Sequence, residues 1–452
     1  MLKGKEMKRP LVRILRWMTG IFLAATLGFY FLNAWFSSYV AGKAFEQMVS
    51  RQASKGLKVQ GQFRGVRRNG FLSASAEHFD GSNDERTMHR LNADSIRATL
   101  NPLGFFRRQW RFDDIEIETG WVELQKSRVK PNPTGEAEEK KEEETRKPWY
   151  SWMLPSRVYL SEVRVADAEV RWPLRHEMGR IRHLQLKILP HGRDFEYFGH
   201  DGTLRMPMVP PLRVAKVQVL ITKTDVDVKW FELRPPSPKD DGFLQLKGHA
   251  EMQGDEKVSA QTHFEKMSLR PWLPASWRDN ASGRFSGDIH WESRGTRLEE
   301  AEASGALVLD GLRLQNLSWL NKLAAVTKNQ AFRDLKMDRA HFKLRWKNAF
   351  WKMDEISLDA GDLLQARGFV QSEDKNLEGK FRIGTSRKNL EWLPDLATDI
   401  FKPGEDGLCW TDVQISGTRD QPVQDLTPRI TKLLMRHPLA AVGLLLRQLD
   451  ED

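Results

Sequence analysis

Apolar and polar residues alternate with a period of two through most of the chain, and this pattern constrains the fold more than any other feature. A local unit with this alternation recurs at residues 115–124, 163–172, 335–344 and, more loosely, 356–363. Within each unit, two apolar-x-apolar stretches flank a small residue. Successive side chains on a strand point to opposite faces, so each half of the unit has one apolar side. Because the small residue permits either a tight turn or a bulge, we expect each unit to be a short hairpin or a bent strand pair.

The recurrence of this unit with little intervening helix predicts a mainly β fold. Any antiparallel sheet alternates in this way, but the repetition favours one long meandering sheet over several compact domains. The length of 452 residues allows either two to four domains or one elongated one. Sixteen tryptophans stand against five tyrosines, and most of them lie in the polar, alternating stretches.

The N-terminal segment combines a basic patch with an uncharged run. Residues 1–16 carry six basic side chains and one acidic one, which accounts for half of the net charge of +10 and argues against a nucleic-acid-binding protein. Residues 17–42 contain no charged side chain, and about 20 apolar residues span a bilayer core. Basic residues before a span keep the N-terminus cytoplasmic. We therefore expect a cytoplasmic segment at 1–16, an uncleaved transmembrane signal anchor at 17–42 and the remaining chain outside the cytoplasm. A cleaved signal peptide, the alternative, would have a shorter apolar core.

The single cysteine, Cys409, excludes a disulfide framework within the chain and a zinc site built on paired cysteines. An exported region of about 400 residues with one thiol suits a bacterial periplasmic protein better than a eukaryotic secreted one.

The exported region divides into five segments by composition. Residues 43–57 have apolar residues at helical spacing and lead into a β region that extends to residue 127. Residues 128–147 combine prolines with a charge run and are expected to form an exposed linker or loop, with a short solvated helix as the alternative. A middle β region follows at 148–299, interrupted by a loop at 234–242.

The last two segments contain helical patterns. A third β region at 300–395 includes a helical insert at 317–332, which is expected to present Leu320, Leu323, Ala324 and Ala331. Residues 396–452 form a C-terminal helical tail, which Pro438 would kink or divide. The tail could cap the sheet, lie on a membrane surface or bind a partner, and capping is the simplest of these interpretations.

The sequence contains few candidates for chemistry. It has no G-x-S-x-G elbow, no dinucleotide fingerprint and no phosphate-binding loop. The closest acid–imidazole pairs are His176 with Glu177 and His290 with Glu292, and neither has metal-ligand spacing on a helix. We predict no catalytic residue, no metal and no cofactor, and hence a protein that is not an enzyme. An envelope hydrolase would require carboxylates or histidines to meet in a cleft.

Residues 300–385 resemble the C-terminal region of the AsmA-like family of bacterial envelope proteins, which is related to the TamB and YhdP types. Six motifs carry the resemblance: Gly305-Ala-Leu-Val-Leu-Asp-Gly311 before the helical insert, Phe332-Arg-Asp-Leu-Lys-Met, Phe342-Lys-Leu, Ile356-Ser-Leu-Asp-Ala-Gly361, Ala366-Arg-Gly368-Phe-Val, and Leu377-Glu-Gly-Lys-Phe-Arg-Ile-Gly384. The resemblance implies an elongated, curved antiparallel sheet, folded into a taco-like β-groove that projects from the inner membrane. It also implies binding or transfer of phospholipids, or of other acyl-chain lipids, in support of outer-membrane biogenesis and envelope integrity.

This resemblance defines the expected site and partners. The expected groove lining consists of alternating apolar residues from the repeated units: Ile115, Ile117, Val163, Val165, Leu335, Met337, Ile356 and Leu358. The alternative for these residues is a packed sheet-to-helix core. The expected partners are phospholipids, the inner membrane and, as further candidates, outer-membrane or other envelope proteins. The alternative function is a non-catalytic assembly factor that aids membrane-protein insertion through exposed strand edges.

Overall fold

The computed structural model of the chain describes residues 42–125, 157–391 and 400–429, a few isolated positions before residue 42, and Lys432. Short gaps fall at 58, 71, 85–87, 108, 175–176, 193, 208, 253–255, 295–300, 318–319, 322–323, 325–326, 349 and 419–420. The predicted linker at 128–147 and most of the predicted C-terminal tail lie outside the described residues. The described chain is mainly β and divides into two compact units, Met1–Pro190 and His191–Asp452.

No helix among the described residues is both long and apolar enough to cross a membrane. The segment 17–42, where the sequence predicts a signal anchor, lies almost wholly outside those residues. The anchor therefore stays a prediction of the sequence.

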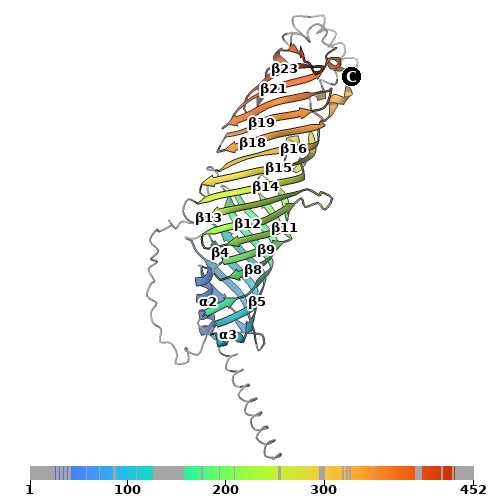
Figure 1. Ribbon diagram of the computed structural model, residues 1–452. Helices are drawn as coiled ribbons and strands as arrows, with labels where there is room; N and C mark the ends of the chain where they lie inside the picture. Colours follow the sequence, from blue (N-terminus) through green and yellow to red (C-terminus); the bar gives the residue numbers. More distant parts are fainter. Residues whose placement is uncertain are drawn as a thin grey trace, which may run out of the picture. The chain divides into compact units, whose positions relative to one another are not determined.

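The first unit is a sheet with one helix packed on it (Figure 1). Its elements are α2 (Lys43–Leu57), β1 (Gln60–Arg64), β2 (Arg67–Arg68), β3 (Ser73–Ser82), β4 (Met88–Asn101), α3 (Leu103–Phe106), β5 (Gln109–Leu124), β6 (Arg157–Leu160), β7 (Val163–Leu174) and β8 (Glu177–His191). Helix α2 has the predicted bounds, and its Phe45 packs edge-to-face on Trp110 with ring centroids 5.6 Å apart. Apolar residues at helical spacing thus bury one side of α2 against the sheet.

One pairing in the first unit departs from the antiparallel prediction. Strand β5 pairs in parallel with β6 and β7, so that Ile115 lies opposite Val163 and Ile117 opposite Val165. A parallel pair requires a connection of a dozen or more residues. Residues 125–156 supply that length between β5 and β6, and the sheet is therefore mixed.

The second unit is a meander. Its strands are β9 (Asp194–His200), β10 (Gly202–Met206), β11 (Val209–Ile221), β12 (Asp225–Arg234), β13 (Phe243–Glu251), β14 (Lys257–Ser268), β15 (Ala281–Arg294), β16 (Glu302–Gln315), β17 (Asp334–Lys336), β18 (Arg339–Lys347), β19 (Phe350–Asp359), β20 (Gln365–Glu373), β21 (Asn376–Ser386), β22 (Lys402–Pro403), β23 (Leu408–Gly417) and β24 (Pro422–Gln424). From β11 to β16 and from β18 to β21, each strand pairs antiparallel with the next, and the loop predicted at 234–242 is the irregular connection between β12 and β13. Figure 1 shows these strands as a series of adjacent arrows, coloured from green to orange along the sequence.

Short helical segments interrupt the meander at three places. Residues Leu320, Asn321, Ala324 and Thr327 are helical, as predicted for the insert, and are followed by the 3-10 turn η5 (Gln330–Arg333). Two further 3-10 turns, η2 (Arg270–Trp272) and η3 (Ala275–Trp277), lie between β14 and β15, and η6 (Arg387–Leu390) follows β21. Leu320 and Ala324 are fully buried, whereas Ala331 is exposed, contrary to its predicted role, because it belongs to the 3-10 turn.

The repeated sequence unit takes both of its predicted forms. Residues 115–124 and 163–172 are continuous within β5 and β7, and β7 is bent by register shifts on either side of Ala168. Residues 356–359 instead end β19, and residues 360–363 lie in the turn to β20, where Gly361 has φ +61°.

Glycines mark the places where neighbouring strands approach closely. A Cβ atom on Gly305 would lie 2.1 Å from the carbonyl oxygen of Asp288, and one on Gly368 would lie 2.1 Å from that of Lys380. Both glycines occupy apolar-face positions, since Gly305 pairs with Leu344 and Gly368 with Phe381. Glycine is the residue that permits a sharp bend in a strand. These positions account for curvature of the sheet at its apolar face.

Candidate functional site

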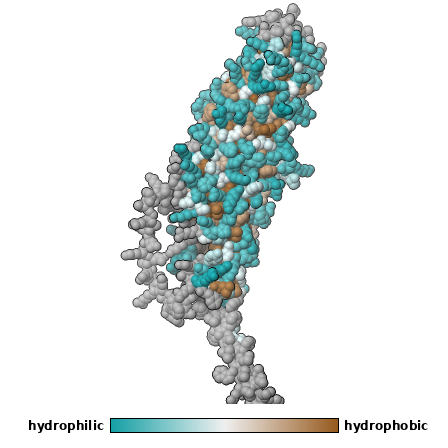
Figure 2. Space-filling model, in the orientation of Figure 1, coloured by the Kyte–Doolittle hydropathy of each residue, from teal (hydrophilic) through white to brown (hydrophobic). Residues whose placement is uncertain are grey.

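One face of the second unit is apolar across successive strands from β11 to β23. Residues that pair directly in a sheet lie on the same face. On this basis Phe231 of β12 shares a face with Leu246 of β13, and Leu344 of β18 shares one with Met353 of β19 and Val370 of β20. The alternate residues of the same strands are charged, and the view in Figure 2 is accordingly mostly hydrophilic, with hydrophobic residues singly or in small groups.

This apolar face is fully covered along one edge. At the end where β14 leads into β15, the buried residues are Val214, Leu233, Leu244, Phe264, Met267 and Phe285. Trp272 in η2 packs edge-to-face on Phe264 and Phe285, with ring centroids 6.2 and 5.8 Å apart. Further along the same edge, Leu320 and Ala324 of the insert join Leu335, Met337 and Ala340 in a closed cluster. We refer to this side as the capped edge.

Buried hydrogen bonds hold the capping segments together. The Asn389 side chain in η6 donates to the carbonyl oxygen of Asp362 and to Thr385 Oγ1, both at 3.1 Å. It also accepts from Asn329, the residue before η5, at 3.2 Å. Two segments 60 residues apart in sequence are therefore fixed to each other and to the sheet.

Most large apolar residues in the middle of the face and at its opposite edge are only half-buried, whereas Ile289 and Val413 are buried. The half-buried residues include Leu307, Phe342, Leu344, Trp346, Trp351, Met353, Val370 and Phe381. In a closed core such side chains would be fully buried and would each touch several neighbours. This part of the face consequently remains partly accessible in the described part of the chain.

Three tryptophans gather at that opposite edge, which we call the tryptophan edge. The rings of Trp291 and Trp346 lie 6.4 Å apart, and Trp346 pairs across the strands with Trp351. The indole nitrogen of Trp291 donates to Thr262 Oγ1 at 3.0 Å. Tryptophan combines a large apolar ring with one polar group, which suits it to a boundary between apolar and wet surroundings.

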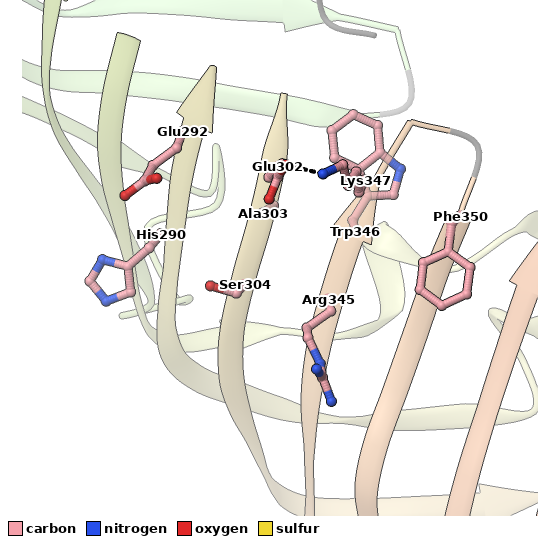
Figure 3. Close-up of a pocket in the computed structure, with 9 residues that line it drawn as sticks. All are labelled: His290, Glu292, Glu302, Ala303, Ser304, Arg345, Trp346, Lys347 and Phe350. Atoms are coloured by element: carbon pink, nitrogen blue, oxygen red, sulfur yellow. Dashed lines mark ion pairs between the residues drawn. The ribbon is translucent and has the colours of Figure 1, made fainter. Parts of the chain in front are cut away.

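A hollow of about 320 Å³ lies beside the tryptophan edge (Figure 3). It is lined by His290 and Glu292 of β15, by Glu302, Ala303 and Ser304 of β16, by Arg345, Trp346 and Lys347 of β18, and by Phe350 of β19. Lys347 forms an ion pair with Glu302, and Arg345 forms one with Asp354. The charged lining residues alternate along their strands with Trp291, Ala303 and Trp346, so their side chains belong to the charged face of the sheet and not to the apolar face.

Four of the eight predicted lining residues lie in the first unit. Ile115 and Val163 pair with each other and are half-buried. Ile117 packs against the cluster of Val59, Phe79 and Ala93, to which α2 also contributes, and its partner Val165 is buried.

The other four predicted residues lie in the second unit near the capped edge. Leu335 and Met337 are buried in the closed cluster under the helical insert, and Leu358 packs against that cluster. Ile356 is also buried. Their surroundings are those of the sheet-to-helix core that the sequence left as the alternative. Sequence reasoning did not single out Trp346, Leu344 or Met353, although the same period-two alternation runs through their strands.

Many charged side chains on the polar faces of the sheets form ion pairs. In the first unit, Glu169 accepts from Arg171 and from Arg182, each at 3.0 Å. These hydrogen bonds, that from Arg171 foremost, lower the pKa of Glu169 to about 2 against the opposing effect of partial burial. Among the described residues no group of three or more His, Cys, Asp or Glu side chains could hold a metal ion. Of the two acid–imidazole pairs noted in the sequence, His290 and Glu292 line the hollow, and His176 lies outside the described residues.

Comparisons with family models, with curated proteins and with solved structures find no match to this chain.

Proposed function

We propose that this chain is a protein of the AsmA-like type, anchored in the bacterial inner membrane and facing the periplasm, that binds phospholipid along a hydrophobic β-groove and transfers it in support of outer-membrane biogenesis. One observation carries the proposal: the apolar face of the second unit is continuous from β11 to β23, and away from the capped edge most of its large side chains are only half-buried. The order of strand, helix, strand, turn and strand over residues 300–385, on which the family resemblance rests, is also present.

Simple transfer energetics support a lipid ligand. Moving one acyl CH₂ group from water to an apolar surface is worth about 0.8 kcal/mol, so roughly twenty buried groups contribute about 16 kcal/mol, which exceeds a cost of about 4–15 kcal/mol for immobilising a lipid. Binding of this kind needs contact area rather than a specific polar pocket. The half-buried Phe342, Leu344 and Met353 provide such area.

The alternative of strand addition at an exposed edge has less support. Strand β24, which pairs with β23 near the end of the described chain, is only three residues long and begins with Pro422. Short edge strands and prolines are devices that prevent strand addition.

Lipid analysis of the purified full-length protein tests the proposal. Mass spectrometry of extracted lipid should detect phospholipid bound to the wild-type chain and clearly less bound to Leu344→Glu, which places a charge on the apolar face. The matched control is Lys343→Glu, one residue away on the opposite, exposed face. Equal lipid in all three proteins would show that the lipid comes from the detergent micelle and would overturn the proposal.

A further inference from the structure

The short helix α3 lies at one end of the first unit (Figure 1) and carries the most exposed large apolar side chain among the residues described after residue 42. This residue, Leu103, is 65% exposed. Tyr159, which is 44% exposed, lies at the same end, because β6 pairs with the first residues of β5. A single exposed leucine is common on protein surfaces, so the surroundings of Leu103 decide what it can bind.

Local bonds fix the turn that carries Leu103. The backbone N–H of Leu103 donates to Asn101 Oδ1, and that of Arg107 donates to the carbonyl oxygen of Gly104, both at 2.9 Å. Gly104 is buried, and a Cβ atom on it would lie 2.6 Å from the carbonyl oxygen of Gln109. Because α3 packs this closely on the start of β5, Leu103 is held at the surface.

Basic side chains accompany this apolar tip. Arg107 directly follows α3 and is exposed. The segment after β2 is joined to β4 by a hydrogen bond from the Leu100 N–H to the Leu72 carbonyl oxygen at 2.6 Å, and Arg68 ends β2 just before it. An apolar tip with cations beside it is typical of a protein segment that lies in the interface of a bilayer with anionic lipids.

The first turn of α2 lies at the same end of the first unit. Helix α2 begins at Lys43, which is exposed and directly follows the uncharged segment 17–42. Phe45 in this turn packs on Trp110, the second residue of β5, and on Leu100. Leu103 therefore lies close to the point where the chain would leave the membrane if segment 17–42 spans it.

From this arrangement we infer that α3 is a second membrane contact, which docks the first unit on the bilayer surface beside the anchor. The Leu103 side chain enters the interface, and Arg68 and Arg107 contact anionic head groups. Two contacts fix the orientation of the first unit on the membrane, whereas a single anchor leaves it free to rotate. This inference rests on the anchor of the proposed function and is independent of lipid binding by the apolar face of the second unit.

Fluorescence quenching tests the contact on the full-length protein in nanodiscs of phosphatidylethanolamine and phosphatidylglycerol. In a Cys409→Ala background, Leu103→Cys and Met178→Cys each receive an NBD label. Met178 is the matched control, because it is an exposed apolar residue of the same unit but pairs with Pro173 at the opposite end of β7. Interfacial side chains reach about 5–10 Å into a bilayer, so brominated lipids should remove roughly half of the fluorescence at position 103 and none at position 178.

The outcomes separate this inference from the proposed function. If the chain enters the nanodisc but the label at position 103 is not quenched, the membrane contact is wrong while the anchor and lipid binding stand. Equal quenching of both labels would mean that the label itself partitions into lipid, and would also refute the contact. A chain that does not enter the nanodisc at all would refute the anchor and this inference together.

A charge reversal tests the part played by the arginines. Arg107→Glu should lower the ratio of docked to undocked first unit roughly fivefold or more, which is read from the quenching at position 103. Arg90→Glu is the matched control, because Arg90 is exposed on β4 and pairs with Glu123 at the opposite end of the sheet. Unchanged quenching in Arg107→Glu, or an equal loss in both variants, would contradict an attraction between this surface and anionic lipids.

Discussion

At the scale of single residues, ion pairs stabilise the charged faces of the sheets, and the side chains of these pairs differ widely in how far they are buried. Most pairs are exposed and contribute little, as surface pairs generally do. The Glu169 carboxylate is an exception, because its side chain is only 20% exposed and it accepts hydrogen bonds from Arg171 on its own strand β7 and from Arg182 on the neighbouring strand β8. It is the group in the first unit whose protonation should affect stability most directly.

We expect the stability of the first unit to depend on Glu169 at moderate acidity. The pKa of Glu169 is lower in the folded protein, about 2, than its ordinary value of 4.5. The ion pairs therefore stabilise the fold fully above pH 4.5, and this stabilisation is lost as the pH falls from 4.5 through 2. After allowance for solvent screening of the arginines, Glu169→Gln should lower the free energy of unfolding by about 1–2 kcal/mol at pH 7.

Denaturant titrations of the wild type and Glu169→Gln at a series of pH values check this expectation. The difference between the two proteins should shrink below pH 4.5 and vanish near pH 2. Glu118→Gln, at an exposed position of β5, is the matched control. A difference that persists unchanged at pH 2 would contradict the assignment.

The second prediction at this scale concerns Asn389. Its side chain is 5% exposed and joins η6 to Asn329 and Thr385. Asn389→Ala leaves the half-buried amide of Asn329 without its acceptor and the buried hydroxyl of Thr385 without its donor, which should cost about 1–3 kcal/mol. Hydrogen exchange should show the loss locally, as faster exchange at the capped edge, and chemical denaturation should show it globally. Asn321→Ala, at an exposed position of the insert, should change neither measurement.

At the scale of secondary-structure elements, the bend of a strand depends on residues that have no side chain. In β16, Gly305 faces the apolar side and Ala306 the exposed side. Gly305→Val must displace the backbone of β15 at Asp288, and we expect it to destabilise the second unit by roughly 1–3 kcal/mol. Ala306→Val adds the same side chain on the outer side and should stay within about 0.5 kcal/mol of the wild type. Thermal unfolding of both variants measures the contrast, and equal effects would show that close strand approach at Gly305 does not matter.

Several elements could be predicted because their signals are local. Helix α2 was predicted to the residue, since apolar positions at helical spacing end where the alternation begins. The loop at 234–242 follows from its prolines, and the insert from its helical periodicity. The parallel pairing of β5 with β7 could not be predicted, because strand partners across residues 125–156 depend on long-range contacts that alternation does not specify.

The sequence predicted the kind of candidate site, an apolar face of a sheet, but not which residues of that face are half-buried. Period-two alternation identifies which residues share the apolar face, and it applies equally to Leu335 and to Leu344. Only the fold shows that Leu335 is covered by the insert while Leu344 remains half-buried. The hollow could not be predicted from the sequence either. Glu292, Glu302 and Lys347 are separated in sequence by loops, and the alternation of the strands does not determine the geometry of those loops.

At the scale of the whole molecule, the proposed function requires that lipid move as well as bind. Along the second unit, each strand contributes only a few apolar residues, so a lipid that moves from strand to strand exchanges one set of contacts for a nearly equivalent one. Binding capacity is then spread over many strands, whereas movement is limited by the least favourable step. A local defect should therefore slow transfer more than it reduces the amount of lipid bound.

The pair of substitutions Leu344→Glu and Met353→Glu creates such a defect, because these residues lie opposite each other on β18 and β19. A moving acyl chain must pass two carboxylates, and each additional 1.4 kcal/mol of barrier slows a rate about tenfold. We expect transfer of fluorescent phospholipid between donor and acceptor vesicles by the full-length protein to fall at least about tenfold. Bound lipid per chain should fall by a smaller factor, since the remaining strands still bind. The pair Lys343→Glu and Ser357→Glu, on the opposite face of the same strands, should transfer lipid at the wild-type rate. If binding and transfer fall in parallel, the lipid occupies a single site and does not travel along the sheet.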